Sequence, residues 1–272
     1  MVQRRDICGA QTVTRPTRIG LVLGAGGTQG GFFIRGALSA LTERTGFVPA
    51  MSSTVIGTSV GALNAARIDH NPVGVDPLVL ELLDALAQTA GPPRRGVTDR
   101  ALAGPRQFLG RVVGRVVPVG SRAADYPVAA GPYHPGVRTV SCRRSDGSRR
   151  IATLARAADP AAELYASAAI PGFSQPVLLD GIEHVDGAIW STTNADLVSP
   201  EDHDLLIVIA PMASRSGGGL LPRSHRAAVL AEVRSWRRAA KPVVLITPSA
   251  HAIERRNDHE AFSTEARNRV LG

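Results

Sequence analysis

The sequence predicts an α/β protein with a central, mostly parallel sheet flanked by helices. Short apolar runs that end in glycine alternate with stretches at helical spacing, and glycine-rich turns join the first two strand–helix pairs. Strands that alternate with helices along a chain form parallel sheets, because each helix returns the chain to the same end of the sheet. We expect residues 18–272 to form one domain that follows a polar arm, residues 1–17.

Composition agrees with a globular protein. The chain has 272 residues, of which 44% are hydrophobic and 20% charged. These values exclude a disordered chain, and no run approaches the ~18 apolar residues of a membrane-spanning helix. Cys8 and Cys142 are the only cysteines, and no secretory leader is visible at the N-terminus. We therefore expect a cytoplasmic protein.

The charge balance is basic, with 31 Lys and Arg against 23 Asp and Glu. Aromatic residues make up only 4% of the chain, and the arginines are scattered. Surfaces that bind nucleic acid need clustered basic residues and often aromatics between them, so we expect no nucleic-acid partner. A peripheral contact with an anionic membrane surface stays open. The oligomeric state is not predicted.

Apolar runs and helical periodicity place the elements of the N-terminal half. The expected elements are a strand over 18–24, a glycine-rich turn over 24–31, a helix over 32–43, a strand over 53–56, a helix from 62 to about 68 and a helix over 76–90.

Hairpins are expected in the C-terminal half, because Asp146-Gly147 and Asp180-Gly181 each separate two short apolar runs. The expected elements are strands over 137–142 and 149–153, a helix over 160–168, strands over 176–179 and 182–185, a strand over 205–210, a helix over 226–239, a strand over 242–247 and a short helix from about 260.

Residues 91–136 interrupt this order with prolines, glycines and arginines. We interpret them as a basic insertion or cap on the same domain. Within them, apolar residues recur every four positions, at Phe108, Leu109, Val112, Val113, Val116 and Val117. This pattern is typical of a helix at a membrane surface or in an acyl-chain pocket, and equally of a helix that packs on the sheet.

The segment Gly57-Thr-Ser59-Val-Gly61 fits the pattern G-x-S-x-G of a nucleophile elbow. A serine on a sharp turn between a strand and a helix has a strained backbone, and the small residues around it relieve the clash. Its hydroxyl then lies near the positive end of the following helix. The alternative is an ordinary turn with a capping serine.

The glycine-rich turn over 24–31 is the second candidate element. The spacing of Gly24, Gly26 and Gly30 fits a dinucleotide-binding fingerprint poorly, because the third glycine comes one residue late. The backbone amides of such a turn can instead form an oxyanion hole, which stabilises negative charge on a carbonyl oxygen under attack. A purely structural glycine turn is the alternative.

Asp186, in the run Asp186-Gly187-Ala188 after the second hairpin, is the candidate base. A carboxylate within ~2.6–3.2 Å of a serine hydroxyl can take its proton, provided that partial desolvation raises its pKa from about 3.9. Asp180-Gly181 is of the same type, but we expect it to form the hairpin turn.

In this order, the three elements resemble the patatin-like phospholipase family. The glycine-rich turn resembles the family's G-G-G-x-[RK]-G, Ser59 lies in its G-x-S-x-G, and Asp186 begins its D-G-[GA]. The stretch Ala166-Ser-Ala-Ala-Ile-Pro-Gly172 resembles the run that usually precedes the aspartate. The likeness spans about residues 18–210.

This resemblance implies a three-layer α/β/α fold and a lipid acyl hydrolase that needs no metal or organic cofactor. It implies that Ser59 is the nucleophile, that Asp186 is the base, and that the backbone of Gly26 and Gly27 forms the oxyanion hole. The supporting motif glycines are Gly30, Gly57, Gly61 and Gly187. Two residues depart from the family pattern: Ala25 replaces its first glycine, and Gln29 replaces its basic residue.

Several alternatives remain open. An acyltransferase would pass the acyl group to an alcohol instead of water. A hydrolase of another type would combine Ser59 with His251 and either Asp202 or Asp204. A non-catalytic α/β module would bind a lipid or a nucleotide.

The remaining polar candidates receive structural interpretations. The histidines show no metal-ligand spacing, so we expect no metal site. We expect His184 to be a surface imidazole and Asn194 to be a turn residue, with a role in orienting its loop as the alternative.

Overall fold

The computed structural model describes residues 17–69, 131–171, 174–213 and 220–249. The helices expected over 76–90 and from about 260, and residues 91–130 of the expected insertion, lie outside the described residues. No described helix is both long enough and apolar enough to cross a membrane.

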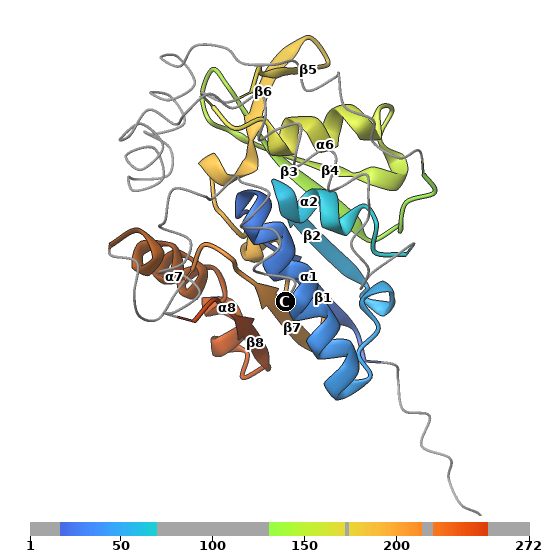
Figure 1. Ribbon diagram of the computed structural model, residues 1–272, viewed down its shortest axis with the longest axis vertical. Coiled ribbons are helices and arrows are strands. Elements are labelled where there is room, and N and C mark those ends of the chain that lie inside the picture. The colour runs from blue at the N-terminus through green and yellow to red at the C-terminus, as the bar shows by residue number, and fades with distance from the viewer. Residues whose placement is uncertain (1–16, 70–130, 172–173, 214–219, 250–272) are drawn as a thin grey trace, which may run out of the picture.

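Eight strands form one sheet in the described part of the chain. They are β1 (Ile19–Leu23), β2 (Thr54–Thr58), β3 (Val137–Arg143), β4 (Arg149–Thr153), β5 (Val177–Leu179), β6 (Ile182–Asp186), β7 (Leu205–Ile209) and β8 (Val243–Ile246). Their order is β5-β6-β3-β2-β1-β7-β8, and β4 also pairs with β3 (Figure 1). Strands β3, β2, β1, β7 and β8 run parallel, so the predicted fold class is confirmed.

Helices cover both faces of the sheet. They are α1 (Gly27–Thr45), α2 (Val60–Ala65), α6 (Pro160–Ala168), α7 (Leu220–Glu232) and α8 (Arg234–Arg238). Leu21 of β1 belongs to the apolar core beneath α1, α2 and α6, which lie together in front of the sheet in Figure 1. Its neighbour Val22 belongs to the opposite core, with Val229 of α7 and Trp236 of α8. Successive strand residues point to opposite faces, so the fold has three layers, α/β/α.

The expected helix over 160–168 matches α6 residue for residue. The glycine-rich turn is shorter than expected, because α1 begins at Gly27 and includes the glycines that follow. Glycine weakens a helix by about 1 kcal/mol relative to alanine, but tertiary packing requires it here. A Cβ atom at Gly26 would lie 2.7 Å from Pro211, and one at Gly30 would lie 3.1 Å from it.

The other helices differ from the expected bounds. The helix after the elbow is regular only to Ala65, and turns follow. The helix expected over 226–239 begins earlier and is broken at Val233 into α7 and α8. The buried residues Val229, Val233 and Trp236 continue one apolar face across this break. The expected strands and both hairpins are present within two residues of the predicted bounds.

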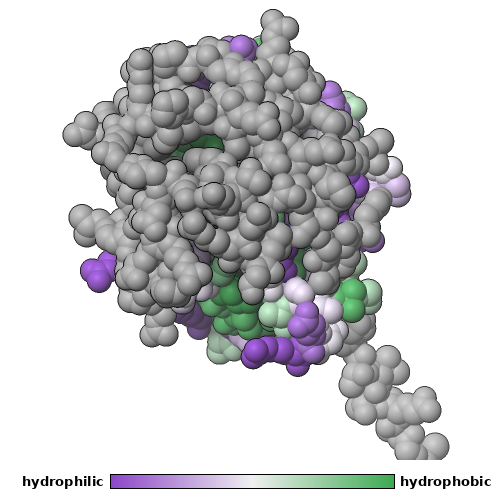
Figure 2. Space-filling view, viewed as in Figure 1, coloured by the Kyte–Doolittle hydropathy of each residue, from purple (hydrophilic) through white to green (hydrophobic). Residues whose placement is uncertain are grey.

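The surface of the described part is mixed in character. On the face seen in Figure 2, apolar and polar residues lie side by side toward the lower end of the view. The exposed large apolar side chains include Val48 and Met51, which follow α1.

Strand β3 holds β2 and β6 on one and the same edge. A strand has only two edges for pairing. Residues 138–140 pair with both β2 and β4, so these two strands lie on opposite edges. Residues 141 and 142 pair with both β4 and β6, so β6 also lies opposite β4. Strands β2 and β6 therefore follow one another along the same edge of β3.

These two strands meet at their carboxyl ends, because β2 runs parallel to β3 and β6 antiparallel. Thr58, the last residue of β2, lies opposite Val140, and Asp186, the last residue of β6, lies opposite Ser141. Adjacent residues of a strand are only about 3.3 Å apart. The residue after Thr58 and the side chain of Asp186 are consequently brought together by sheet register.

The junction leaves no room for a side chain at Gly187. Its Cβ atom would lie 2.2 Å from the carbonyl oxygen of Val140. We expect Gly187→Ala to lower the free energy of unfolding by about 2 kcal/mol or more, because the backbone of β3 or of residue 187 must move to make room for the methyl group. Gly36, in α1, has no heavy atom within 4 Å of a Cβ position. Gly36→Ala should therefore stabilise the protein by about 0.5–1 kcal/mol. Urea denaturation measures both changes, and equal stability of the two variants would contradict the close approach at Gly187.

Candidate active site

Ser59 lies on the turn between β2 and α2, with φ 57° and ψ −128°. A non-glycine residue in this conformation is strained by about 1–3 kcal/mol. Both glycines of the motif are required by close packing. A Cβ atom at Gly57 would lie 2.4 Å from Ala62 Cα, and one at Gly61 would lie 2.0 Å from the Leu23 carbonyl oxygen. The spacing G-x-S-x-G thus lets α2 start directly against the ends of β1 and β2.

The side chain of Asp186 reaches Ser59. Its carboxyl lies close enough to the Ser59 side chain for that hydroxyl to lower its pKa, and its Oδ1 accepts a hydrogen bond of 2.8 Å from the Ala188 N–H. Only 3% of Asp186 is exposed. Burial raises the pKa of Asp186 to about 7, against the smaller lowering effects of the Ala188 amide and the Ser59 hydroxyl. The site therefore pairs a serine with a carboxyl group that gains and loses a proton near neutral pH.

The glycine-rich turn lies at the same end of the sheet, because β1 and β2 are parallel and adjacent. Gly26 precedes the first residue of α1, and Gly27 has a left-handed φ of 59°. The first amides of a helix have no carbonyl four residues back to bind. The amides of Gly26 and Gly27 are of this kind, and the start of α1 carries a partial positive charge.

Backbone hydrogen bonds anchor this turn from two sides. The Gly24 N–H donates to the Ile209 carbonyl at 2.9 Å, and the Ala25 N–H donates to the Thr192 carbonyl at 2.7 Å. Ala25 is not among the residues with positive φ, so its methyl group causes no strain. The turn is thereby tied to the loop that follows Asp186.

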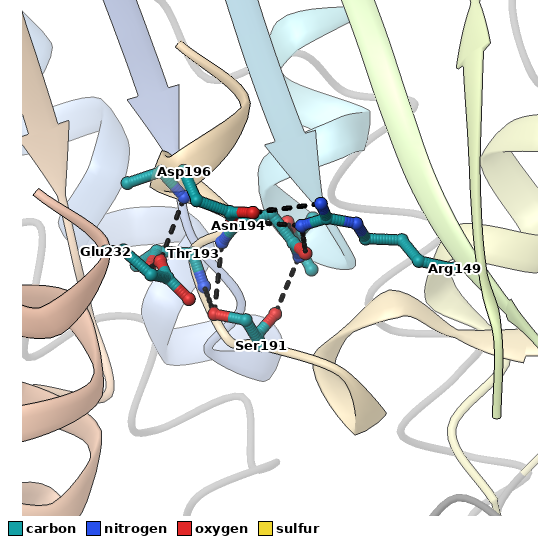
Figure 3. A network of polar contacts seen from close by, with 8 residues as sticks. Arg149, Ser191, Thr193, Asn194, Asp196 and Glu232 are labelled. Carbon is teal, nitrogen blue, oxygen red and sulfur yellow. Dashed lines mark hydrogen bonds and ion pairs between the residues drawn. The ribbon is translucent and has the colours of Figure 1, made fainter. Parts of the chain in front are cut away.

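That loop contains Asn194, which is fully buried and has a left-handed φ of 54° (Figure 3). Its Nδ2 donates to Thr58 Oγ1 at 3.1 Å and to the Ser191 carbonyl at 2.7 Å. Its Oδ1 accepts from Arg149 at 3.1 Å. Asn194 is the expected turn residue, but its side chain also holds the strand end next to Ser59. The tolerance of asparagine for the left-handed region is a sequence signal for the turn, whereas the contact with Thr58, 136 positions away, has no local signal.

Two charged side chains, one from the sheet and one from helix α7, fix the same loop from opposite sides (Figure 3). Arg149 of β4 makes two hydrogen bonds of 2.9 Å to the Asp196 carboxylate and lies over the Trp190 ring at 5.2 Å from its centroid. Glu232 of α7 accepts from Thr193 Oγ1 at 2.6 Å and from the Ala195 N–H at 2.9 Å. Sequence reasoning missed this network, because its members are distant along the chain.

The expectation of a surface imidazole at His184 is wrong. His184 is only 2% exposed, and its Nδ1 lies 3.0 Å from the Ile182 carbonyl oxygen. It is buried because helix α6 packs on β6 and brings Glu163 near His184. Burial lowers the pKa of His184, so it is an uncharged core residue at neutral pH.

The alternative acids for Ser59 lie at the wrong end of the sheet. Asp202 and Asp204 precede β7, whereas Ser59 follows the parallel strand β2. Five strand residues span about 16 Å, so neither carboxylate reaches Ser59. Asp204 instead accepts a hydrogen bond of 2.8 Å from the Arg18 N–H. His251 lies outside the described residues. Among the described residues, no group of three or more His, Cys, Asp and Glu side chains could hold a metal ion.

Removing the side chain of Asn194 should destabilise the protein through the lost hydrogen bonds, in addition to any cost of placing another residue at a positive φ. Asn194→Ala loses the bonds to Thr58, Ser191 and Arg149, and we expect the free energy of unfolding to fall by about 2 kcal/mol or more. Asn194→Gly is the control, because glycine adopts a positive φ freely but loses the same bonds. Denaturation should show a clear loss for both variants. Wild-type stability of the glycine variant would mean that only the turn conformation matters.

Asp186→Asn should stabilise the fold above neutral pH. The Asp186 pKa is about 7 in the folded protein and about 3.9 in the unfolded chain. Between these values the folded state keeps a proton that the unfolded chain has lost, so wild-type stability falls as the pH rises. The full difference is about 4 kcal/mol. Denaturation should therefore find the neutral variant more stable at pH 8 and close to wild type at pH 4. Equal stability at pH 8 would argue against a buried, ionised carboxylate.

Comparison with known proteins identifies the family of the chain. A family model described as patatin-like phospholipase matches residues 21–199. Among solved structures, the crystal structure of VipD from Legionella pneumophila matches with 16% identity and a TM-score of 0.39, over 82% of this chain and 55% of that one. The chain thus spans little more than half the length of that protein. No match was found among curated proteins. Because the family model covers well over half of the sequence, the chain belongs to the patatin-like phospholipase family.

Proposed function

We propose that the protein hydrolyses acyl esters of lipids, with Ser59 as nucleophile and Asp186 as general base. Its family is one of lipid hydrolases. The observation that carries the proposal is the meeting of the carboxyl ends of β2 and β6 on β3, which brings the Ser59 side chain close to the buried Asp186 carboxyl. A carboxylate in this position can accept the serine proton directly, without an imidazole between them.

In the first half-reaction, Ser59 Oγ attacks the acyl carbonyl carbon while its proton passes to Asp186. A C–O bond forms, and the carbonyl π electrons move to the oxygen. The amides of Gly26 and Gly27 at the start of α1 are the proposed donors to this oxyanion. When the intermediate collapses, the C–O bond to the alcohol breaks, and the alcohol takes the proton from Asp186. An acyl-enzyme remains.

In the second half-reaction, water replaces the alcohol. Asp186, again ionised, accepts a proton from water as its oxygen attacks the acyl carbon. Collapse releases the fatty acid, and the proton returns to Ser59 Oγ. A carboxyl with a pKa of about 7 suits both steps, because it is a stronger base than an exposed aspartate yet still donates a proton readily.

The burial of the pair favours this chemistry. Ser59 is 4% exposed and Asp186 is 3% exposed. In a site of low polarity, a proton shared between oxygen atoms and an amide aimed at an oxyanion both act more strongly than in water. A cytoplasmic location stays a prediction. Peripheral contact with an anionic membrane also stays a prediction, because residues 91–130, which motivated it, lie outside the described part.

The two proposed catalytic side chains should be indispensable for ester hydrolysis. We expect Ser59→Ala and Asp186→Asn each to lower kcat/KM for p-nitrophenyl esters by about 1,000-fold or more. Ser53→Ala and Asp180→Asn are matched controls, because both side chains are exposed. The wild-type kcat/KM should rise with pH and level off above about 7, where Asp186 is ionised. Undiminished activity of either catalytic variant would remove the pair.

A fluorophosphonate probe distinguishes this enzyme from a non-catalytic binding module. The folded wild-type protein should be modified at Ser59, as detected by mass spectrometry, and Asp186→Asn should slow the modification. A folded protein that stays unmodified would favour the module.

A further inference from the structure

The last turn of α6 contacts both proposed catalytic residues. Ser167 Oγ accepts a hydrogen bond of 3.1 Å from the Ser59 N–H. Two residues later, the Ala169 carbonyl accepts a hydrogen bond of 2.9 Å from the Asp186 N–H. Ser167 is 0% exposed and Ala169 is 1% exposed. One short segment therefore binds the backbones of nucleophile and base at the same time.

The helix end is suited to this double contact. The last carbonyls of a helix have no intrahelical donor, which leaves the Ala169 oxygen available to Asp186. Pro171 follows two residues later and does not continue the helix. Ser167 lies one turn before this proline, within α6. Its hydroxyl points to the turn that carries Ser59.

Helix α6 is itself held firmly to the sheet. At its start, Asp159 Oδ1 accepts from the Ala162 N–H at 2.9 Å, and Pro160 occupies the first helical position. Glu163 accepts a hydrogen bond of 2.7 Å from Arg150 of β4. Leu164 and Ala166 are fully buried in the last two turns. The positions of Ser167 and Ala169 are thus fixed by the core and not by the residues that they contact.

The Ser59 amide needs such an acceptor. Its φ of 57° and ψ of −128° remove Ser59 from both the strand before it and the helix after it. A buried backbone N–H is almost always paired. Because φ and ψ determine where the side chain leaves the backbone, an acceptor that fixes the amide also fixes the direction of the Cα–Cβ bond that carries Oγ.

We propose that Ser167 is a positioning residue for the nucleophile. Its hydroxyl holds the Ser59 backbone in the strained turn, while the Ala169 carbonyl holds Asp186, so that Ser59 Oγ stays within hydrogen-bonding reach of the carboxylate. This inference rests on the proposed function. A displacement of about 1 Å in a reacting group can slow a reaction by about 100-fold.

The test measures acylation of Ser59 in Ser167→Ala and Ser167→Cys. The alanine variant lacks the acceptor, whereas a thiol has nearly the same volume and is a weak acceptor. We expect the rate of fluorophosphonate modification and kcat for p-nitrophenyl esters to fall by about 10- to 100-fold in Ser167→Ala, with KM within about twofold of wild type. Ser167→Cys should lie between the two. A role in packing alone would leave the cysteine variant at the wild-type rate.

Thr54→Val is the matched control. Thr54 Oγ1 lies 3.0 Å from His203 Nε2 at the opposite end of β2 and is also buried. This variant loses one buried hydrogen bond at the far end of β2 from Ser59, so it should acylate at the wild-type rate. If Ser167→Ala and Thr54→Val acylate equally fast, the positioning role is wrong.

Other outcomes are equally decisive. If Ser167→Ala does not fold, the rate of Ser167→Cys decides alone, because wild-type acylation overturns the inference and slowed acylation supports it. A folded wild type that is not modified at Ser59 would overturn both the function and the positioning role. Modification that is insensitive to residue 167 would overturn only the latter.

Discussion

The site depends on the way β3 pairs along one edge with two strands of opposite direction. A parallel strand and an antiparallel strand that share an edge must meet end to end, and here both carboxyl ends meet beside Val140 and Ser141. Hydrogen-bond register then places Ser59 against Asp186 with no contribution from a flexible loop. Gly187 is part of the same constraint, because β6 can end so close to β3 only where no Cβ atom is present.

The site combines features that oppose folding with others that stabilise it. A strained serine and a buried carboxyl both lower stability, by about 1–3 and a few kcal/mol respectively. Around them, the buried network of Asn194, Arg149 and Glu232 satisfies the polar groups of the loop after Asp186. The groups come from different elements, so the loop is tied to strands β2 and β4 of the sheet and to helix α7. Chemistry that needs a fixed geometry gains from this, because reacting groups must hold their positions before the substrate binds.

Local chemistry explains which parts of the structure could be predicted. The bounds of α6 follow from Asp159 and Pro160, a capping residue and a first-turn proline that favour a helix start, and from Pro171, which does not continue a helix. The elbow follows from two glycines at fixed spacing. Burial of His184, by contrast, depends on the packing of α6 against β6, and the absence of side chains at Gly26 and Gly30 is explained by Pro211, far along the chain. The roles of Asn194 and Ser167 depend on partners far along the chain, which no local pattern reveals.

The departures from the family pattern in the glycine-rich turn follow the same physical logic. Ala25 replaces a glycine where φ is not positive and where the amide, not the side chain, makes the contact to Thr192. Gly26 and Gly27 are kept, one because Pro211 lies where its side chain would be and the other because its φ is 59°. Gln29, half-buried in the first turn of α1, takes the place of a cation. The turn is anchored by backbone hydrogen bonds to Ile209 and Thr192, so its shape does not require that charge.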